Sequence, residues 1–126
     1  MSGNARATDV MKALNDFFSR FADAWAEGCV PDDAAYPLIT YPPTLPAALE
    51  TVPFYARVWH RSRQYGDVAA LVDEIDAAIG PGLRLPTAHG GAVWLYKGDK
   101  FMQFAPVRDD PDLKCAYLSL ALAANA

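Results

Sequence analysis

The two histidines, His60 and His89, are the residues in this chain best suited to acid–base or metal chemistry. His60 lies between Trp59 and Arg61, and His89 lies in the segment TAHGG. A histidine that binds a metal or acts as a general base needs a further ligand or a carboxylate that can reach it. Neither histidine has such a companion nearby in the sequence. We therefore expect no catalytic residue and no metal site at either one.

Carboxylates are grouped in two places, at Asp32-Asp33 and at Asp109-Asp110 with Asp112. A calcium loop of the EF-hand type would require alternating acidic positions, a glycine and a later glutamate, and this pattern is absent. Both groups stand beside prolines. Aspartate is favoured in turns because its side chain hydrogen-bonds the nearby backbone. We interpret both groups as turn residues.

Glycine and serine motifs that hold phosphates or provide nucleophiles are also missing. The glycines form neither GxGxxG nor the phosphate-binding GxxxxGK[ST] loop, and no serine lies in GxSxG. We expect no bound cofactor and no enzymatic activity.

Composition limits the remaining classes of protein. A chain of 126 residues with 52% hydrophobic residues suits a single globular domain over residues 1–126. Its net charge of −4 argues against binding nucleic acid through phosphate neutralisation. No stretch approaches the roughly 20 apolar residues of a membrane span. Cys29 and Cys115 lack disulfide or metal-site spacing, so we expect two buried thiols in a reducing cytosol.

Two segments show the apolar spacing of amphipathic helices. The first covers residues 7–27, includes Trp25 in its apolar stripe, and is expected to end at Gly28. The second lies within residues 61–82, with Ser62 or Gln64 as its N-terminal cap and Gly80-Pro81-Gly82 as its end.

Short runs rich in β-branched and aromatic residues predict strands. Three of these runs cover residues 37–43, 52–60 and 115–124, and the first is expected to be an edge or short strand because prolines bound it. Residues 91–97 and 100–106 are expected to form a hairpin around Gly98-Asp99. The expected fold is α+β: a largely antiparallel sheet of about four to five strands, with two amphipathic helices packed on one face.

Three features suggest a surface that binds other proteins. Tyr55, Arg57 and Trp59 alternate along one side of their strand, next to Arg61 and Arg63, and aromatic residues with arginine are typical of protein interfaces. Residues 91–97 carry large apolar side chains on both faces, so Trp94 and Tyr96 are expected to pack on something else. The connection from Pro42 to Thr51 is apolar and includes Leu45 and Leu49. The alternative is a monomer whose own helices cover the second face of the sheet.

Three blocks of sequence resemble a family of small siphophage proteins, described as minor capsid, tail-completion or tail-terminator proteins. The blocks are CVPDDAAYPLITYPP, FYARVWHRSRQYGDVAALVDEIDAAIG and GGAVWLYKGDKFMQFAPVRDDPDLKCAYLSLAL, and together they run from about Phe17 to Leu122. The chain departs from the family pattern at Gln64, in its longer N-terminus and in the proline-rich residues 42–51. These departures affect the loops that would meet partners.

The resemblance implies an α/β subunit that is made in the cytoplasm of a bacterial host. It would assemble as a ring, typically a hexamer, at the head-proximal end of a phage tail in the virion. Such a ring stops growth of the tail tube and provides the surface for head–tail joining. The implied partners are other copies of the chain, the tail-tube protein and a head-completion or connector protein. DNA would pass through the ring without specific binding, which suits an acidic chain.

Residues 42–51 and 108–112, including Arg108, Asp109 and Asp110, are the segments expected to become ordered on assembly. One rival reading is another head–tail connector component, or the equivalent part of a gene-transfer particle or contractile injection device. Another rival, from a different class, is a small-molecule-binding or enzymatic domain in which Trp59, His60, Tyr65 and His89 converge on a pocket.

Overall fold

The first helix, α1 (Ala7–Phe18), begins where its apolar spacing predicts. The computed structural model describes residues 6–46 and 50–124. Within α1, the apolar side chains spaced three and four residues apart are buried: Val10, Leu14, Phe17 and Phe18. The helix nevertheless ends at Phe18, so the predicted extension to Gly28 is wrong.

The end of α1 is explained by Asn15 and by the strand that follows. The Asn15 side-chain amide donates hydrogen bonds to the Ala24 carbonyl oxygen at 3.0 Å and to the Tyr41 hydroxyl at 2.9 Å. The chain must turn after Phe18 for these bonds to form, and residues 23–26 then pair with a neighbouring strand instead of continuing the helix. Trp25 therefore belongs to a strand, although its spacing from Phe21 is helical.

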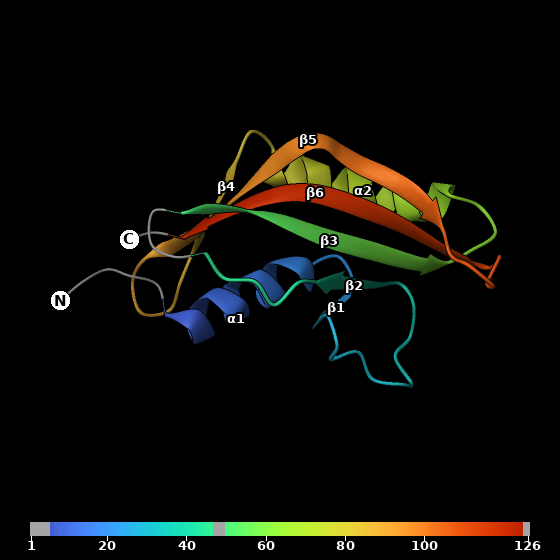
Figure 1. The fold of residues 1–126 in the computed structure, drawn as a ribbon, viewed down its shortest axis with the longest axis horizontal. Helices are drawn as coiled ribbons and strands as arrows, with labels where there is room; N and C mark the ends of the chain where they lie inside the picture. The colour runs from blue at the N-terminus through green and yellow to red at the C-terminus, as the bar shows by residue number, and fades with distance from the viewer. Residues whose placement is uncertain (1–5, 47–49, 125–126) are drawn as a thin grey trace.

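A six-stranded sheet forms the rest of the fold (Figure 1). Its order is β1-β2-β3-β6-β5-β4, in which β1 and β2 are parallel and all the other pairs are antiparallel. The strands are β1 (Asp23–Ala26), β2 (Leu38–Tyr41), β3 (Thr51–Arg61), β4 (Leu83–Pro86), β5 (Ala92–Pro106) and β6 (Leu113–Ala124). The α+β class is confirmed, but the sheet has more strands than the predicted four to five, and it is mixed. Strand β2 is short, as predicted, but it lies inside the sheet with all four residues buried.

Residues 91–97 and 100–106 do not form a hairpin, because they belong to the single long strand β5. Lys97 pairs with Leu120 and Met102 pairs with Leu118, so four residues of β5 stand opposite Ser119 alone. The turn-like Gly98-Asp99 is therefore a bulge in a strand. The alternating β6 is long enough to pair with both halves of β5, which explains why the chain continues instead of reversing.

The second helix, α2 (Gly66–Ile79), buries one apolar stripe, as predicted: Val68, Val72, Ile75 and Ile79. It ends at Gly80, whose φ of +56° suits glycine. Neither Ser62 nor Gln64 caps its N-terminus, where Tyr65 occupies the capping position. The Ser62 hydroxyl instead accepts a hydrogen bond from the Gln64 backbone N–H, which forms a local turn before the helix.

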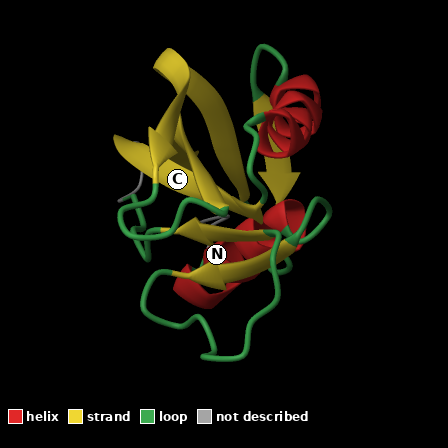
Figure 2. Cartoon of the chain, turned by 90° about the vertical axis from the view of Figure 1, so that its right-hand side faces the viewer, coloured by secondary structure: helices red, strands yellow, loops and turns green. Residues whose placement is uncertain are grey.

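Both helices contribute to the same core as the inward side chains of β3 and β6. Helix α2 lies against β3, β5 and β6, whereas α1 lies against both edge strands, β1 and β4. The sheet must curl for its two edges to reach one helix, and this strong twist is visible in Figure 2. The other face of the sheet is consequently convex and faces away from both helices.

Candidate interaction surface

The outer face, by which we mean the sheet face turned away from α1 and α2, is lined along β3 by Tyr55, Arg57 and Trp59. The intervening side chains of β3 are fully buried in the core: Phe54, Ala56 and Val58. Tyr55 is the most open of the outer three, with 56% of its surface exposed. The predicted alternation along this strand is confirmed, and a period-two strand places alternate residues on opposite faces.

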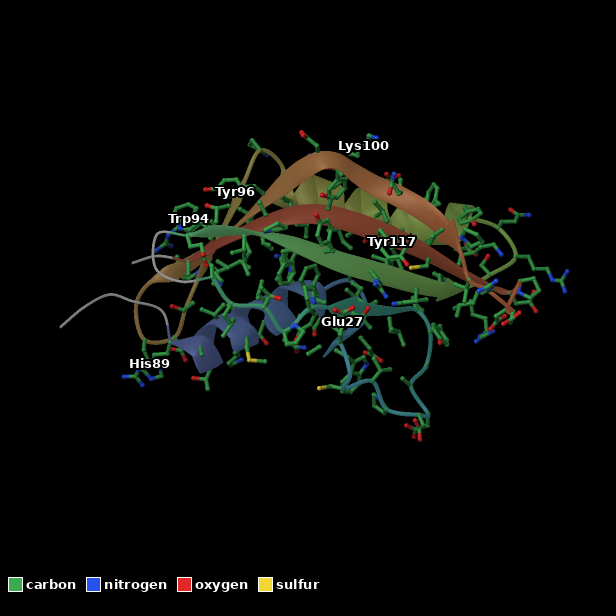
Figure 3. The ribbon with its side chains drawn as sticks, viewed as in Figure 1. Glu27, His89, Trp94, Tyr96, Lys100 and Tyr117 are labelled. Atoms are coloured by element: carbon green, nitrogen blue, oxygen red, sulfur yellow. The ribbon has the colours of Figure 1, made fainter. Side chains whose placement is uncertain are left out.

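Strand β5 extends the outer face with Trp94 and Tyr96, whose neighbours Val93 and Leu95 are buried. In Figure 3 these two aromatic residues and Lys100 follow β5, while Tyr117 lies on β6. The Arg84 guanidinium carbon lies 5.7 Å from the centre of the Trp94 ring, so the arginine covers part of that ring. The alternative of a second face covered by the chain's own helices is wrong, since both helices pack on the opposite side.

Tyr117 occupies the middle of this face, between β3 and β5. It pairs with Arg57 on one side and Gln103 on the other. The Arg57 guanidinium carbon lies 4.9 Å from the centre of the Tyr117 ring, within the range of a cation–π contact. Tyr117 was not among the residues predicted from the sequence to contact a partner. The alternation of leucines in β6 would have placed it outward, since it sits between two inward positions.

Two open hollows lie on either side of Tyr117. The first, of about 320 Å³, is lined by Tyr55, Asp99, Lys100, Gln103, Tyr117 and Ser119. The second, of about 190 Å³, is lined by Trp59, Ala105, Pro106, Val107, Arg108, Cys115 and Tyr117. The bulge in β5 supplies Asp99 and Lys100 to the first hollow, and Arg108 from the loop after β5 borders the second. Each hollow therefore has an aromatic wall and a cation at its rim.

Arg61 and Arg63, which follow Trp59, are paired with the loop between β5 and β6. Arg61 Nη1 lies 3.2 Å from Asp110 Oδ2, and Arg63 Nε lies 3.0 Å from Asp112 Oδ1. The Ser62 backbone N–H also donates to the Asp112 carbonyl oxygen at 2.7 Å. These contacts give the 108–112 loop a defined position in the isolated subunit. Asp109 adopts a φ of +67°, consistent with its predicted role as a turn residue.

The connection before β3 contains two leucines, Leu45 and Leu49, that were predicted to contact a partner. Leu45 is exposed. Leu49 lies outside the described residues. The interface role of this connection stays a prediction.

The two histidines lie at opposite ends of the molecule. His60 pairs in register with Lys114 near the end of β3, whereas His89 lies in the turn before β5, close to the start of α1 (Figure 3). His89 nevertheless has a carboxylate partner from a distant part of the sequence, since its Nδ1 lies 2.8 Å from Asp9 Oδ2. Asp9 is buried at the edge of an open groove between α1 and residues 86–88, with Lys12 and Asp16 also on its wall.

The proposed convergence of Trp59, His60, Tyr65 and His89 on one pocket is also wrong. Trp59 is on the outer face, where its indole N–H donates to the Thr40 hydroxyl at 3.0 Å. Tyr65 packs on Phe104 with ring centroids 4.9 Å apart, at the start of α2. Three of the four side chains therefore serve separate contacts in different parts of the fold.

The cysteines differ from each other. Cys115 is buried between Trp59 and Ala105 in the sheet, as expected, and burial raises the pKa of its thiol to about 11. Cys29 is exposed, so the prediction of two buried thiols is wrong for this residue. It follows Gly28 in the turn after β1, where its N–H donates to the Ala26 carbonyl oxygen, and the turn directs it away from the core.

Within residues 6–46 and 50–124, no group of three or more His, Cys, Asp or Glu side chains is arranged to hold a metal ion. In the same ranges, neither helix has the length and apolar character needed to span a membrane.

Comparison with known proteins supplies a fold but no family. No family model matches the sequence, and no curated protein matches it. Among solved structures, a chain in the "Virion of native gene transfer agent (GTA) particle" is similar, with a TM-score of 0.66 at 13% identity. The likeness covers 97% of this chain and 96% of that one. At this identity it establishes that the two chains share a fold over nearly their whole lengths.

Proposed function

We propose that this chain is a structural protein of a phage-like virion, and that it acts as a tail terminator. In this role several copies, six in the arrangement implied by the sequence resemblance, form a ring on the head-proximal end of the tail tube. The ring stops growth of the tube and provides the surface that joins tail to head. The protein performs this task by binding other proteins and has no catalytic role.

The observation that carries the proposal is the whole-length likeness to a chain of a gene transfer agent virion. The likeness covers 97% of this chain and 96% of that one, so it extends over nearly all of both folds. This likeness is one of shape, whereas the resemblance of the three sequence blocks to siphophage tail-terminator proteins is one of residue type. Two independent comparisons therefore point to virion assembly.

The outer face supports a role in binding proteins. Tyr55, Trp94, Tyr96 and Tyr117 share one side of the sheet with Arg57, and neither helix covers them. Aromatic residues and arginine are enriched where proteins meet, and a ring subunit must contact its neighbours and the tube at once.

A second candidate function is a different head–tail joining component, including the corresponding part of a gene transfer agent. The similar chain belongs to a gene transfer agent particle, which is consistent with either position in the virion. Both candidates share ring assembly and differ in where the ring sits.

Removal of the gene from the particle-producing strain distinguishes the two. Loss of a terminator leaves tube growth unchecked, so electron micrographs would show tails of widely varying, excessive length. Loss of a head-completion component would leave tails of normal length that are detached from heads. Normal, infectious particles in the absence of the chain would refute both.

A biochemical test uses the purified chain and the purified tail-tube protein. Light scattering over a concentration series should show a ring-sized species, either alone or on addition of tube. Addition of the chain to growing tubes should also shorten them in proportion to its concentration. A monomer at every concentration that leaves tube length unchanged would contradict the proposal.

A further inference from the structure

Charge is unevenly divided between the two sides of this acidic molecule. Helix α2 contains four acidic residues and no lysine or arginine: Asp67, Asp73, Glu74 and Asp76. Asp76 is paired with Lys97 of β5. Within the described part of the chain, no ion pair links a lysine or arginine to any of the other three. The solvent side of α2 is thus negative.

The outer face has the opposite character around its centre. Arg57 stacks on Tyr117, Lys100 lies at the hollow on one side of that ring, and Arg108 lies at the hollow on the other. Among the described residues, Asp99 is the single acidic side chain that lines either hollow. Three cations therefore surround an aromatic centre on a protein whose net charge is −4.

The shape of the solvent side of α2 also suits an aromatic surface. Asp67, Ala70, Glu74 and Ala77 are exposed and spaced three, four and three apart, so they follow one stripe, with Asp73 beside it. Two alanines leave flat places between the carboxylates, where a ring can approach the helix closely. Asp67 and Glu74 are separated by about 10 Å along the axis, at 1.5 Å per residue.

From these two surfaces we infer that the outer face around Tyr117 docks onto the solvent side of α2 of a second copy of this chain. In this arrangement Lys100 and Arg108 of one copy approach the carboxylates of α2 in the next, and Tyr55 and Tyr117 lie over its alanines. Opposite charges at an interface set orientation and partner choice. The inference rests on the proposed ring and names the surfaces that close it.

Association between unlike surfaces proceeds head to tail, and it gives a closed ring when the rotation per subunit divides a full turn. Two outer faces placed against each other would bring the cations of Arg57, Lys100 and Arg108 together, and like charges oppose such a contact. Nucleic acid is a poorer occupant of this face, because Asp99 shares a hollow with Lys100 and repels phosphate.

Reversal of charge on one surface at a time provides the test. The outer-face variant is Lys100→Glu/Arg108→Glu, and the helix variant is Asp73→Lys/Glu74→Lys. The control, Asp32→Lys/Asp33→Lys, makes the same change in net charge as the helix variant on an exposed loop outside both surfaces. Circular dichroism and the thermal midpoint identify variants that remain folded. If the double outer-face variant fails to fold, Lys100→Glu alone replaces it.

Mass is measured by light scattering at low salt over a concentration series, with and without tail-tube protein. Each surface variant alone should weaken self-association by about tenfold or more, whereas the control should assemble like the unmodified chain. An equimolar mixture of the two surface variants should recover assembly, since every junction in an alternating ring again joins opposite charges. Added salt should weaken the unmodified assembly, because the charged groups are at the surface.

Failure of this inference and failure of the proposed function give different results. Rings that form equally well with all variants would overturn the proposed surfaces and leave the terminator role intact. An outer-face variant whose only defect is in retention of DNA or of tube protein would likewise overturn docking between copies. An unmodified chain that stays monomeric even with tube would refute the ring itself, and the inference with it.

Discussion

His89 Nδ1 lies 2.8 Å from the Asp9 carboxylate, and this contact joins the turn before β5 to the first turn of α1. The Asp9 side chain is only 8% exposed, whereas that of His89 is 56% exposed. The buried Asp9 carboxylate therefore needs a hydrogen-bond partner, and the more exposed His89 imidazole provides one. The geometry indicates a structural link between two elements that are distant in sequence.

Replacement of His89 by alanine should lower the free energy of unfolding by about 1–3 kcal/mol, because the buried Asp9 carboxylate loses its hydrogen-bond partner. Asp9→Asn should also destabilise, since an acidic side chain in the first turn of a helix is favoured by the helix dipole. Urea denaturation of both single variants and the double variant gives the coupling energy. Additive effects in this cycle would show that the two side chains do not interact.

The sequence was sufficient to predict most elements whose pattern is set by contact with the core. The alternation in β3 and β6 identified their inward faces, and Gly80 identified the end of α2, because these features follow from period and backbone conformation. The outward position of Tyr55 followed from the alternation in β3, and that of Tyr96 from the alternation within residues 91–97. The aromatic residues of the outer face other than Tyr117 could therefore be identified from the sequence alone.

Three errors arose where tertiary contacts override a local pattern. The helical spacing from Phe17 through Phe21 to Trp25 continues past the true end of α1, because the turn after it packs Phe21 on Phe17 with ring centroids 5.3 Å apart. Gly98-Asp99 looks like a hairpin turn, but the length of β6 makes it a bulge. The Asp9–His89 contact spans 80 positions and has no sequence pattern at all.

Gly98 is expected to be intolerant of a side chain. A Cβ atom there would lie 2.8 Å from the Ser119 hydroxyl oxygen and 3.3 Å from the Ser119 carbonyl oxygen. Gly98→Ala should lower the thermal midpoint, and adding Ser119→Ala should recover only part of the loss, because the carbonyl remains. Gly66→Ala is the matched control: its Cβ would meet nothing within 4 Å, and alanine favours the helix there. An unchanged midpoint for Gly98→Ala would mean that the bulge can relax away from β6.

The two cysteines should react at very different rates with a thiol reagent near pH 8. Cys29 is exposed, so it should be labelled rapidly, whereas Cys115 should be labelled only on unfolding. Mass spectrometry of the native and denatured chain after brief alkylation measures both. Equal labelling of the two in the native chain would contradict the buried position of Cys115.

Burial of Cys115 also predicts a loss of stability at alkaline pH. Its pKa rises from 9.0 to about 11 in the folded chain, so between these values the folded state keeps a proton that the unfolded state releases. The stabilising effect is therefore complete below pH 9 and is lost as pH rises through about 11. Urea midpoints at several pH values should fall less steeply for Cys115→Ala than for the unmodified chain. Identical slopes for the variant and the unmodified chain would show that the Cys115 thiol does not contribute to the loss of stability at alkaline pH.

Tyr55 is the residue whose replacement should best separate assembly from stability. With 56% of its surface exposed on the outer face, it contributes little to the core, so Tyr55→Ser should change the free energy of unfolding by no more than about 0.5 kcal/mol. Aromatic side chains at interfaces often contribute strongly to binding, so self-association or binding to tube should fall by about tenfold. Met11→Ser, at a residue 39% exposed on α1, is the control for loss of an exposed apolar side chain away from the outer face. Light scattering and urea denaturation on the same samples give both quantities. If Met11→Ser impairs assembly and Tyr55→Ser does not, the interacting surface lies on the helical side and the outer face has another role.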